Sequence, residues 1–536
     1  MASKTRSFFL NAISLTFTAL FMRGVSVIFN VYVSNRAGSE AMGLYSLLGS
    51  VYSFAITLAT AGINLGTTRL VSEALGRGDI AQARRSAKRA LLYCLLTGSI
   101  ATVLLFTLAP VIGSSVLGDL RAVTPLRCLA VTLIPVAVCS CLSGYFTGVR
   151  RVKVNAAFQV VTQFSKIGAT VFLLSLLVER GTEMACIALV LGGAVSELLS
   201  LLVSYILYRI DLKKMLTGNG QENGTSKPIT GALLAITLPV TFSACIRSLL
   251  SMLQHVLIPR CLTASGASWS EALSSYGALH GMALPVILFP SAFISAFAGL
   301  LIPEVSEYCV QQNSARLKRV SYRALTFSLI FSIGVSGIML FFSEQLGSVI
   351  YHNSETALYI RVLAPLIPVM YIDSAVDAIL KGSGHQVYSM NVNIADVLAA
   401  CILVVALIPS LGIWGYVISI YVTEILNTTL SLCKMISVSG IKVKILHQIA
   451  MPILCIIGAT NGVKLILSLT SHPFGQVTEL ILHVVLTTLV YLILLLVTNT
   501  IGKDEKEVIS ASLLLKSASQ RREKIIQQYK NENPAG

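Results

Sequence analysis

Two arginines stand inside stretches that are apolar enough to cross a lipid bilayer. Arg23 lies near the middle of residues 11–33, and Arg247 takes the corresponding place in residues 233–258. A charged side chain at the bilayer centre costs about 2.5–3.5 kcal/mol on insertion scales, so it usually marks a functional site. Two guanidinium groups that face one cavity can bind a phosphate or pyrophosphate through paired N–H donors. The alternative is that each arginine forms a buried ion pair that only fixes helix packing.

A histidine marks a second candidate position. His280 lies in a stretch that Pro285 and Pro290 are expected to kink or break. A broken helix beside a cavity suits ligand binding and a rocking motion, whereas a merely bent helix would serve packing alone. His280 is therefore a candidate substrate contact that senses pH, although a lone histidine is commonly a packing residue.

Acidic side chains inside the apolar stretches form a third group of candidates. Asp373 and Asp377 lie four residues apart, and therefore on one helical face, and Asp396 follows in the next apolar stretch. These carboxylates could bind a coupling proton or sodium ion. They could equally pair with Lys166, Lys464 or an arginine and serve only packing.

The sequence lacks the patterns that catalysis or a bound metal would require. No G-x-x-x-x-G-K-[ST] phosphate loop occurs, so we expect no ATP hydrolysis by this chain. The eleven cysteines are scattered through apolar stretches without C-x-x-C spacing, which predicts neither a metal site nor a disulfide framework. We therefore expect a protein that is not an enzyme and that needs no cofactor.

Composition places the chain in a membrane. Hydrophobic residues make up 55% of its 536 residues and charged residues only 12%, against about 25% charged residues in soluble domains. A net charge of +16 would suggest a nucleic-acid partner in a soluble protein. Here it is better explained by positive residues in cytoplasmic loops, so the expected partner is the lipid bilayer and not a nucleic acid.

Hydropathy predicts about fourteen transmembrane helices, at about 20 residues for each span. Their approximate centres are Leu20, Ala55, Ala101, Leu133, Ala169, Gly193, Leu249, Leu288, Ile333, Pro368, Leu398, Ile420, Ile457 and Leu486. With the N-terminus in the cytoplasm, 30 of the 40 Lys and Arg residues fall on the cytoplasmic side and six on the outer side. This bias predicts a multi-pass protein of the cell membrane with both termini cytoplasmic.

The first part of the sequence recurs further along the chain. Ser39-Glu40-Ala41 reappears as Ser270-Glu271-Ala272, and Val71-Ser72-Glu73 as Val305-Ser306-Glu307. We therefore predict an all-α polytopic membrane protein with two six-helix lobes related by a parallel repeat. The expected parts are an N-terminal lobe (1–210), a cytoplasmic linker (211–230), a C-terminal lobe (231–440), two additional transmembrane helices (441–502) and a basic cytoplasmic tail (503–536).

Several short motifs, in this order, resemble one known superfamily. They are F-M-R-G at 21–24, G-S-E-A-M-G-L-Y at 38–45, G-I-N-L-G-T-T-R-L-V-S-E at 62–73, L-I-P-E-V-S-E at 301–307 and L-K-G-S-G at 380–384. The chain resembles the MOP exporter superfamily and, within it, the polysaccharide-biosynthesis branch of stage V sporulation protein B and the lipid II flippases. The resemblance covers about residues 7–500.

This resemblance implies fourteen helices, two six-helix lobes and alternating access to a central cationic cavity. It implies that an undecaprenyl-pyrophosphate-linked sugar is carried to the outer face, and Arg23 aligns with an arginine on which relatives rely. Relatives of the lipid II type often carry a second arginine and an acid further along that helix. Phe29 and Asn30 stand there in this chain, so we expect a less charged cavity with Asn30 among its substrate contacts.

Three hypotheses follow for the function. The first is a flippase for a lipid-linked sugar pyrophosphate, most simply a peptidoglycan precursor such as lipid II, used for the spore cortex. The second is a drug or cation antiporter of the same superfamily, which would depend on the buried acids but would suffer from the arginines. The third is a membrane scaffold without transport that recruits cell-wall or sporulation enzymes through its basic loops and tail.

Overall fold

The computed structural model describes residues 2–60, 62–149, 151–216, 229–441, 446–468 and 475–498. Within these ranges all regular secondary structure is helical, and no strand occurs. This confirms the prediction of an all-α polytopic membrane protein. Most of the predicted linker (211–230) and the whole predicted tail (503–536) lie outside the described residues.

Contacts between helices divide the chain into two compact units, and each is described by itself. The first unit comprises Met1–Ala296, Leu346–Leu363 and Val387–Leu430. The second comprises Phe297–Gln345, Ala364–Gln386 and the described residues of Ser431–Gly536. These units are defined by contacts and not by the sequence repeat, so the division into two six-helix lobes stays a prediction.

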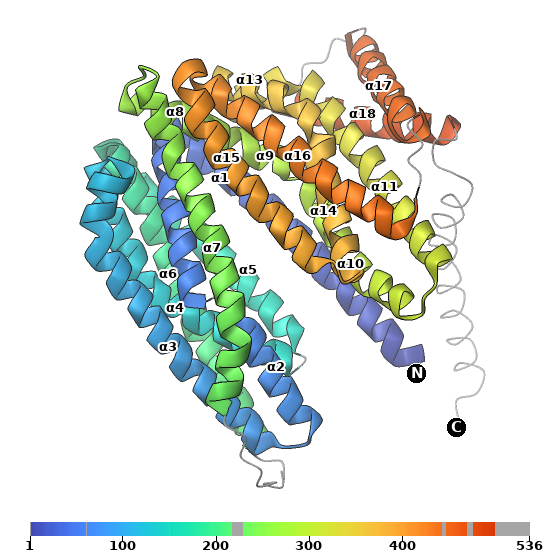
Figure 1. The fold of residues 1–536 in the computed structure, drawn as a ribbon. Helices are drawn as coiled ribbons and strands as arrows, with labels where there is room; N and C mark the ends of the chain where they lie inside the picture. The colour runs from blue at the N-terminus through green and yellow to red at the C-terminus, as the bar shows by residue number, and fades with distance from the viewer. Residues whose placement is uncertain are drawn as a thin grey trace, which may run out of the picture. The chain divides into compact units, whose positions relative to one another are not determined.

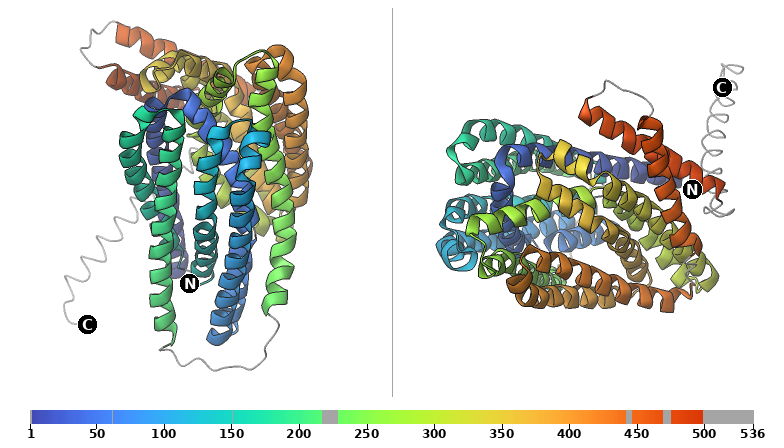
Figure 2. Two further views of the ribbon diagram at one scale, coloured as in Figure 1. Left: turned by 90° about the vertical axis from the view of Figure 1, so that its left-hand side faces the viewer. Right: turned by 90° about the horizontal axis from the view of Figure 1, so that it is seen from above.

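The first unit contains the candidate residues near the N-terminus. Its complete helices are α1 (Ala2–Thr60), α2 (Ile63–Gly76), α3 (Ile80–Val111), α4 (Val123–Gly148), α5 (Val152–Leu177), α6 (Thr182–Leu216), α7 (Ile229–Ala264), α8 (Trp269–Tyr276), α9 (Leu284–Leu288) and α13 (Ser354–Leu363). Helix α3 packs on α4, α5 on α6, and α4 on α6, and Figures 1 and 2 show these four helices running side by side. Parts of α10 (Ser291–Val310), α15 (Gln386–Leu411) and α16 (Ile413–Ser439) complete this unit.

The second unit is built around a long central helix. Its complete helices are α11 (Ser314–Phe341), α12 (Ser343–Gln345), α14 (Ile367–Gly382), α17 (Met451–Ser468) and α18 (Gln476–Val497). Helix α11 packs against α14 and α17. The hydroxyl of Tyr491 on α18 donates a hydrogen bond of 2.8 Å to the carbonyl oxygen of Ile330. The last two helices are therefore tied to α11.

The described residues contain thirteen helical stretches that are long and apolar enough to cross a membrane. The difference from the expected fourteen arises in the first stretch, Leu20–Gly76, which includes the first two expected centres. Helix α1 includes both centres but is interrupted at Gly38, where φ is 82° and ψ is 169°. This backbone conformation is not helical and is essentially restricted to glycine, so two helical segments meet at Gly38 without a loop between them.

The helical stretch that carries His280 runs through Pro285 and is interrupted at Pro290, one of the two prolines at which a kink or break was predicted. Residues Gly277–Ala283 form a π-helical segment, and α9 follows and ends before Pro290. Proline removes a backbone N–H donor and clashes with the preceding turn, which accounts for a helix end at this position. The next candidate span, Ser291–Val310, begins only after the break, so the expected centre at Leu288 lies just before that span.

Two glycines allow α1 to cross the α8 region at backbone contact. A Cβ atom added to Gly43 would lie 2.0 Å from the carbonyl oxygen of Leu273, and one added to Gly277 would lie 2.0 Å from that of Ser39. Only glycine fits at such distances. Next to the crossing, the hydroxyls of Ser39 and Ser274 lie 2.6 Å apart. The two copies of the repeated sequence therefore pack directly on each other at this point.

A charged cluster joins the same region to the connection between α3 and α4. Arg121 pairs with Asp119 at 2.8 Å and with Glu40 of α1 at 2.9 Å, and the indole N–H of Trp269 donates to Asp119 at 2.9 Å. Burial by itself would raise the pKa of Asp119. The hydrogen bonds from Arg121 and Trp269 outweigh burial and lower that pKa below its ordinary value.

Replacing Asp119 by Asn should lower the thermal unfolding midpoint at neutral pH, because Arg121 loses a charged partner. A carboxyl with a lowered folded-state pKa stabilises the protein above its unfolded-state pKa of about 3.9, and this contribution is lost as pH falls through the folded-state value. The difference between wild type and Asp119→Asn should therefore shrink below about pH 4. Unfolding scans of purified protein at several pH values measure it, and a difference that stays constant with pH contradicts the assignment.

Candidate functional site

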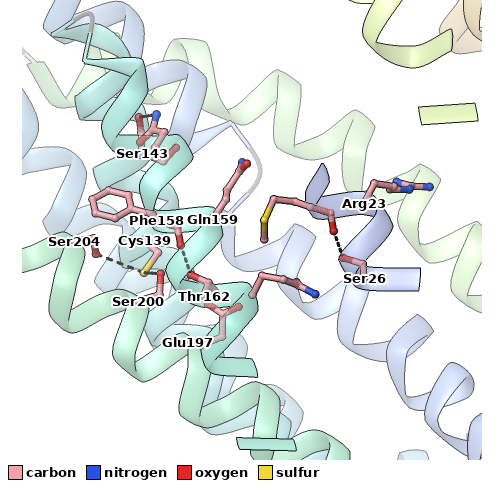
Figure 3. A pocket seen from close by; sticks show the side chains of 13 residues that line it. Arg23, Ser26, Cys139, Ser143, Phe158, Gln159, Thr162, Glu197, Ser200 and Ser204 are labelled. Atoms are coloured by element: carbon pink, nitrogen blue, oxygen red, sulfur yellow. Dashed lines mark hydrogen bonds between the residues drawn. The ribbon is translucent and has the colours of Figure 1, made fainter. Parts of the chain in front are cut away.

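The first unit holds two adjoining cavities beside α1, α5 and α6. We call the first the polar chamber; it has a volume of about 450 Å³ and is shown in Figure 3. It is lined by Met22, Arg23, Ser26, Cys139, Ser143, Asn155, Phe158, Gln159, Thr162, Gln163, Glu197, Ser200 and Ser204. We call the second the cationic chamber; its volume is about 500 Å³. It is lined by Arg23, Ser26, Val27, Phe29, Asn30, Val33, Met42, Tyr45, Ser46, Gly49, Gln163, Lys166, Thr170, Leu189, His280, Gly281 and Pro285.

Arg23 stands at the boundary between the chambers, because it lines both together with Ser26 and Gln163. Figure 3 shows Arg23 and Ser26 on the α1 side of the polar chamber, with Glu197 on the opposite side. Arg23 is exposed and forms no salt bridge with any other described residue. Within the described part of the chain, the guanidinium is therefore available to an anion in the cavity.

Lys166 supplies a second cation to the cationic chamber. It lies on α5, one turn after Gln163, and it forms no salt bridge to another described residue. Glu197 on the neighbouring helix α6 lies near enough to interact with it electrostatically. Arg23 and Lys166 therefore bring two positive charges to the cationic chamber, and none of its described lining residues is a carboxylate.

His280 lies on the π-helical segment within a stack of rings. Its ring lies 5.2 Å from that of Tyr276 at an interplanar angle of 7° and 4.5 Å from that of His255. The Nδ1 atom of His280 is buried and has no hydrogen-bond partner among the described residues. Asn30 donates a hydrogen bond of 3.2 Å to the carbonyl oxygen of Gly281. Asn30 thus holds α1 against the segment that carries His280.

The structure brings together three of the four predicted substrate contacts. Arg23, Asn30 and His280 all line the cationic chamber. Arg247, on α7, is exposed and lines neither chamber. The pairing of Arg23 with Arg247 in one cavity therefore does not appear in these two chambers, and the binding roles of all four residues stay predictions.

The three predicted coupling acids line neither chamber. Asp373 and Asp377 lie on α14 in the second unit, and Asp377 pairs with Lys381 one turn later. Asp396 lies on α15 in the first unit. Among the described residues, no group of three His, Cys, Asp or Glu side chains is placed to hold a metal ion. The coupling role of these acids stays a prediction.

The polar residues of α5 and α6 that line the chambers were not predicted as site residues from the sequence. The side chains of Asn155, Gln159 and Gln163 recur every four residues, which places them on one face of α5. Lys166 follows on the same helix and had been considered only as a partner for buried acids. The recurrence of amides within an otherwise apolar stretch was the signal that could have found this face.

Comparisons with known proteins agree with this architecture. Stage V sporulation protein B of Bacillus subtilis (strain 168) is 27% identical over 94% of this chain and 98% of its own length. A solved structure of the lipid II flippase MurJ in an inward closed conformation has a TM-score of 0.66 at 13% identity, covering 91% of this chain and 99% of that one. An inward-facing multidrug resistance MATE transporter of the MOP superfamily has a TM-score of 0.59 at 16% identity, covering 80% of this chain and 99% of that one.

Two family profiles match the sequence. The MatE profile matches residues 239–406, and the profile described as polysaccharide biosynthesis protein matches residues 8–309, more than half of the chain. The two solved relatives are named as a flippase and a transporter and not as enzymes, in agreement with the sequence prediction. The chain belongs to the family described as polysaccharide biosynthesis protein.

Proposed function

We propose that this protein is a flippase that moves an undecaprenyl-pyrophosphate-linked sugar from the cytoplasmic to the outer leaflet. The observation that carries the proposal is the pair of cations, Arg23 and Lys166, in one cavity without a salt bridge to a described residue. A guanidinium can bind a pyrophosphate through two parallel N–H donors, and an ammonium adds a point charge beside it. The prenyl chain stays in the lipid, where it loses no hydrophobic contact.

Transport proceeds by alternating access, in which the substrate shifts the population between inward-open and outward-open states. The sequence contains no ATP-binding loop, so an ion gradient, the membrane potential or consumption of the product outside must drive net movement. The name of the lipid II flippase relative favours a peptidoglycan precursor as the substrate. The sporulation relative favours a role in the spore cortex, where cell-wall enzymes would take up the product.

We propose that both termini lie in the cytoplasm, which the distribution of Lys and Arg supports. A fluorescent reporter that folds only in the cytoplasm should therefore be bright when it is fused to the C-terminus. A dark but well-expressed fusion, together with an active periplasmic-type reporter at the same position, contradicts this orientation.

The direct test uses purified full-length protein in liposomes with a fluorescent undecaprenyl-pyrophosphate-linked N-acetylhexosamine. Transfer of the lipid between leaflets, measured by quenching from outside, should exceed that of protein-free liposomes under an ion gradient or a membrane potential. If no imposed gradient produces transfer by correctly inserted protein, the proposal fails. Efflux of a cationic dye by the same liposomes would instead favour the antiporter.

Replacing Lys166 by Gln should weaken binding of the pyrophosphate lipid about tenfold, because one charged hydrogen bond is lost. Lys166→Arg keeps the charge and should retain most of the affinity. Binding to the purified variants in nanodiscs measures both values. An exposed lysine at another position, Lys464→Gln, is the matched control and should bind like wild type. Equal affinity of wild type and Lys166→Gln would remove this residue from the site.

A further inference from the structure

The polar chamber has a wall of neutral hydrogen-bonding side chains on the side away from Arg23. Helix α5 contributes Asn155 and Gln159, and α6 contributes Ser200 and Ser204. Figure 3 shows Gln159, Ser200 and Ser204 on the side of the chamber away from Arg23. Side-chain amides and hydroxyls both donate and accept hydrogen bonds, as sugar hydroxyl and acetamido groups do. Such a wall inside a membrane protein would be costly if it faced lipid. It therefore suits a polar ligand.

Much of the hydrogen-bonding capacity of this wall is unused. Gln159 and Gln163 form no side-chain hydrogen bond with another described residue. Asn155 donates to the carbonyl oxygen of Ser143 at 3.1 Å and to the hydroxyl of Thr147 at 2.9 Å, which fixes its side chain. The sulfur of Cys139 lies 3.8 Å from the hydroxyl of Ser200 and 3.7 Å from that of Ser204, which is a weak interaction. The Ser204 hydroxyl also donates a hydrogen bond of 3.1 Å to the carbonyl oxygen of Leu201 and keeps its capacity to accept one. Gln159 and Gln163 can therefore bind a ligand without first breaking an internal bond, and the Oδ1 atom of Asn155, which has no partner among the described residues, can accept one.

An aromatic ring completes the lining. Phe158 is 9% exposed and lines the chamber, and its ring packs edge-on against Phe146 at 5.5 Å. Ligand sites typically combine such apolar surface with a few placed polar groups, in cavities of about 300–1,000 Å³. The 450 Å³ of the polar chamber falls within this range.

Glu197 determines which class of ligand is compatible with this wall. It is the one carboxylate among the described residues that line either chamber. A negative charge here repels a second negative charge within a few ångströms, whereas it accepts hydrogen bonds from hydroxyl and N–H groups. The chamber is thus suited to an uncharged sugar and unsuited to an acidic one.

Arg23 lies where the polar chamber meets the cationic chamber. Arg23, Ser26 and Gln163 line both chambers, so a pyrophosphate held at Arg23 would place its attached sugar at the entrance of the polar chamber. We infer that the polar chamber is a subsite for the sugar of the lipid-linked substrate and that it selects neutral, hydroxyl- and amide-bearing sugars over acidic ones. This inference rests on the proposed flippase function and adds the substrate class.

The first experiment measures the contribution of the sugar to binding. Full-length protein in nanodiscs is titrated with undecaprenyl pyrophosphate and with the same lipid carrying one neutral N-acetylhexosamine. Wild type should bind the glycosylated lipid at least tenfold more tightly. The double variant Gln159→Leu, Ser204→Ala should lose most of this difference while its affinity for the sugar-free lipid stays within twofold. Ser175→Ala, an exposed hydroxyl on α5 outside both chambers, is the control and should behave as wild type.

The second experiment tests selection against acidic sugars. Wild type should bind the lipid with a neutral sugar at least tenfold more tightly than the lipid with a uronic acid. Glu197→Gln should reduce that ratio to about one by improving affinity for the uronic acid. If wild type binds both sugars equally, or if Glu197→Gln leaves the ratio unchanged, the assignment of Glu197 is overturned.

Different results would contradict the sugar subsite and the proposed flippase function. If wild type binds the sugar-free and the glycosylated lipid with equal affinity, the sugar subsite is overturned while the pyrophosphate site stands. If wild type binds neither lipid, the proposed function fails and the subsite falls with it. A loss of affinity for both lipids in Gln159→Leu, Ser204→Ala would assign these residues to the pyrophosphate and would also overturn the subsite.

Discussion

Arg23→Lys should insert and fold like wild type while its transport rate falls roughly ten- to hundredfold. The substitution keeps the positive charge but removes the planar fork that holds a pyrophosphate through two N–H donors. Loss of one charged hydrogen-bonded contact costs about 1.5–3 kcal/mol, which corresponds to this range. Flippase activity for each correctly inserted molecule is the measurement. Normal activity of Arg23→Lys would remove the binding role proposed for this residue.

Arg247→Lys tests whether Arg23 and Arg247 share one binding site. Both were predicted to share one site, but Arg247 lines neither chamber. If substrate binds in the chambers described, Arg247→Lys should retain most of its activity. A loss as large as that of Arg23→Lys would show that Arg247 reaches the substrate in another conformation and would restore the original pairing.

Gly277→Ala should be the most destabilising single methyl addition in the first unit. The new Cβ would lie 2.0 Å from the carbonyl oxygen of Ser39 and 2.6 Å from the backbone nitrogen of Gly43. Both neighbours are backbone atoms, so no side chain can rotate aside, and α1 must move away from the π-helical segment. Overpacking of this kind typically costs about 1–3 kcal/mol or more. The thermal unfolding midpoint of detergent-purified protein should fall clearly.

Gly193→Ala is the matched control for that experiment. Gly193 lies inside α6, and a Cβ added there meets nothing within 4 Å. Alanine is favoured over glycine in a helix interior by about 1 kcal/mol, so this variant should unfold at the same temperature as wild type or slightly higher. If Gly277→Ala matched Gly193→Ala, the close crossing would not exist in solution.

The fold could be predicted largely from the sequence because hydropathy reports directly on helices that cross a membrane. The helix break at Pro290 could also be predicted, since proline acts through local backbone chemistry. The number of spans differed because two helical segments of α1 meet at Gly38 without a loop and form one stretch. Hydropathy alone cannot separate a kink from a loop when few polar residues intervene.

The site was harder to predict because it depends on how each helix is rotated about its own axis, which decides the side chains that face the chambers. Arg23 and Arg247 occupy equivalent places in the repeat, yet only Arg23 lines the chambers. Equivalent residues also differ elsewhere: Glu40 pairs with Arg121, whereas Glu271 caps the start of α8 through Ser268. A repeated motif therefore fixed the helix in each copy but not the partner of each side chain. Lys166 is not part of a repeated motif, so the sequence did not identify it as a binding residue.

The backbone contact at Gly43 and Gly277 has a mechanical consequence. Two surfaces with no clearance can turn about their point of contact but cannot slide past each other without a clash, so this crossing acts as a fulcrum. Seventeen residues separate Gly43 from the end of α1 at Thr60, a lever of about 25 Å at 1.5 Å per residue. A turn of about 15° at the fulcrum would sweep the far end of that lever through roughly 6 Å. Small angular changes at the crossing would thereby become displacements of several ångströms at the end of α1.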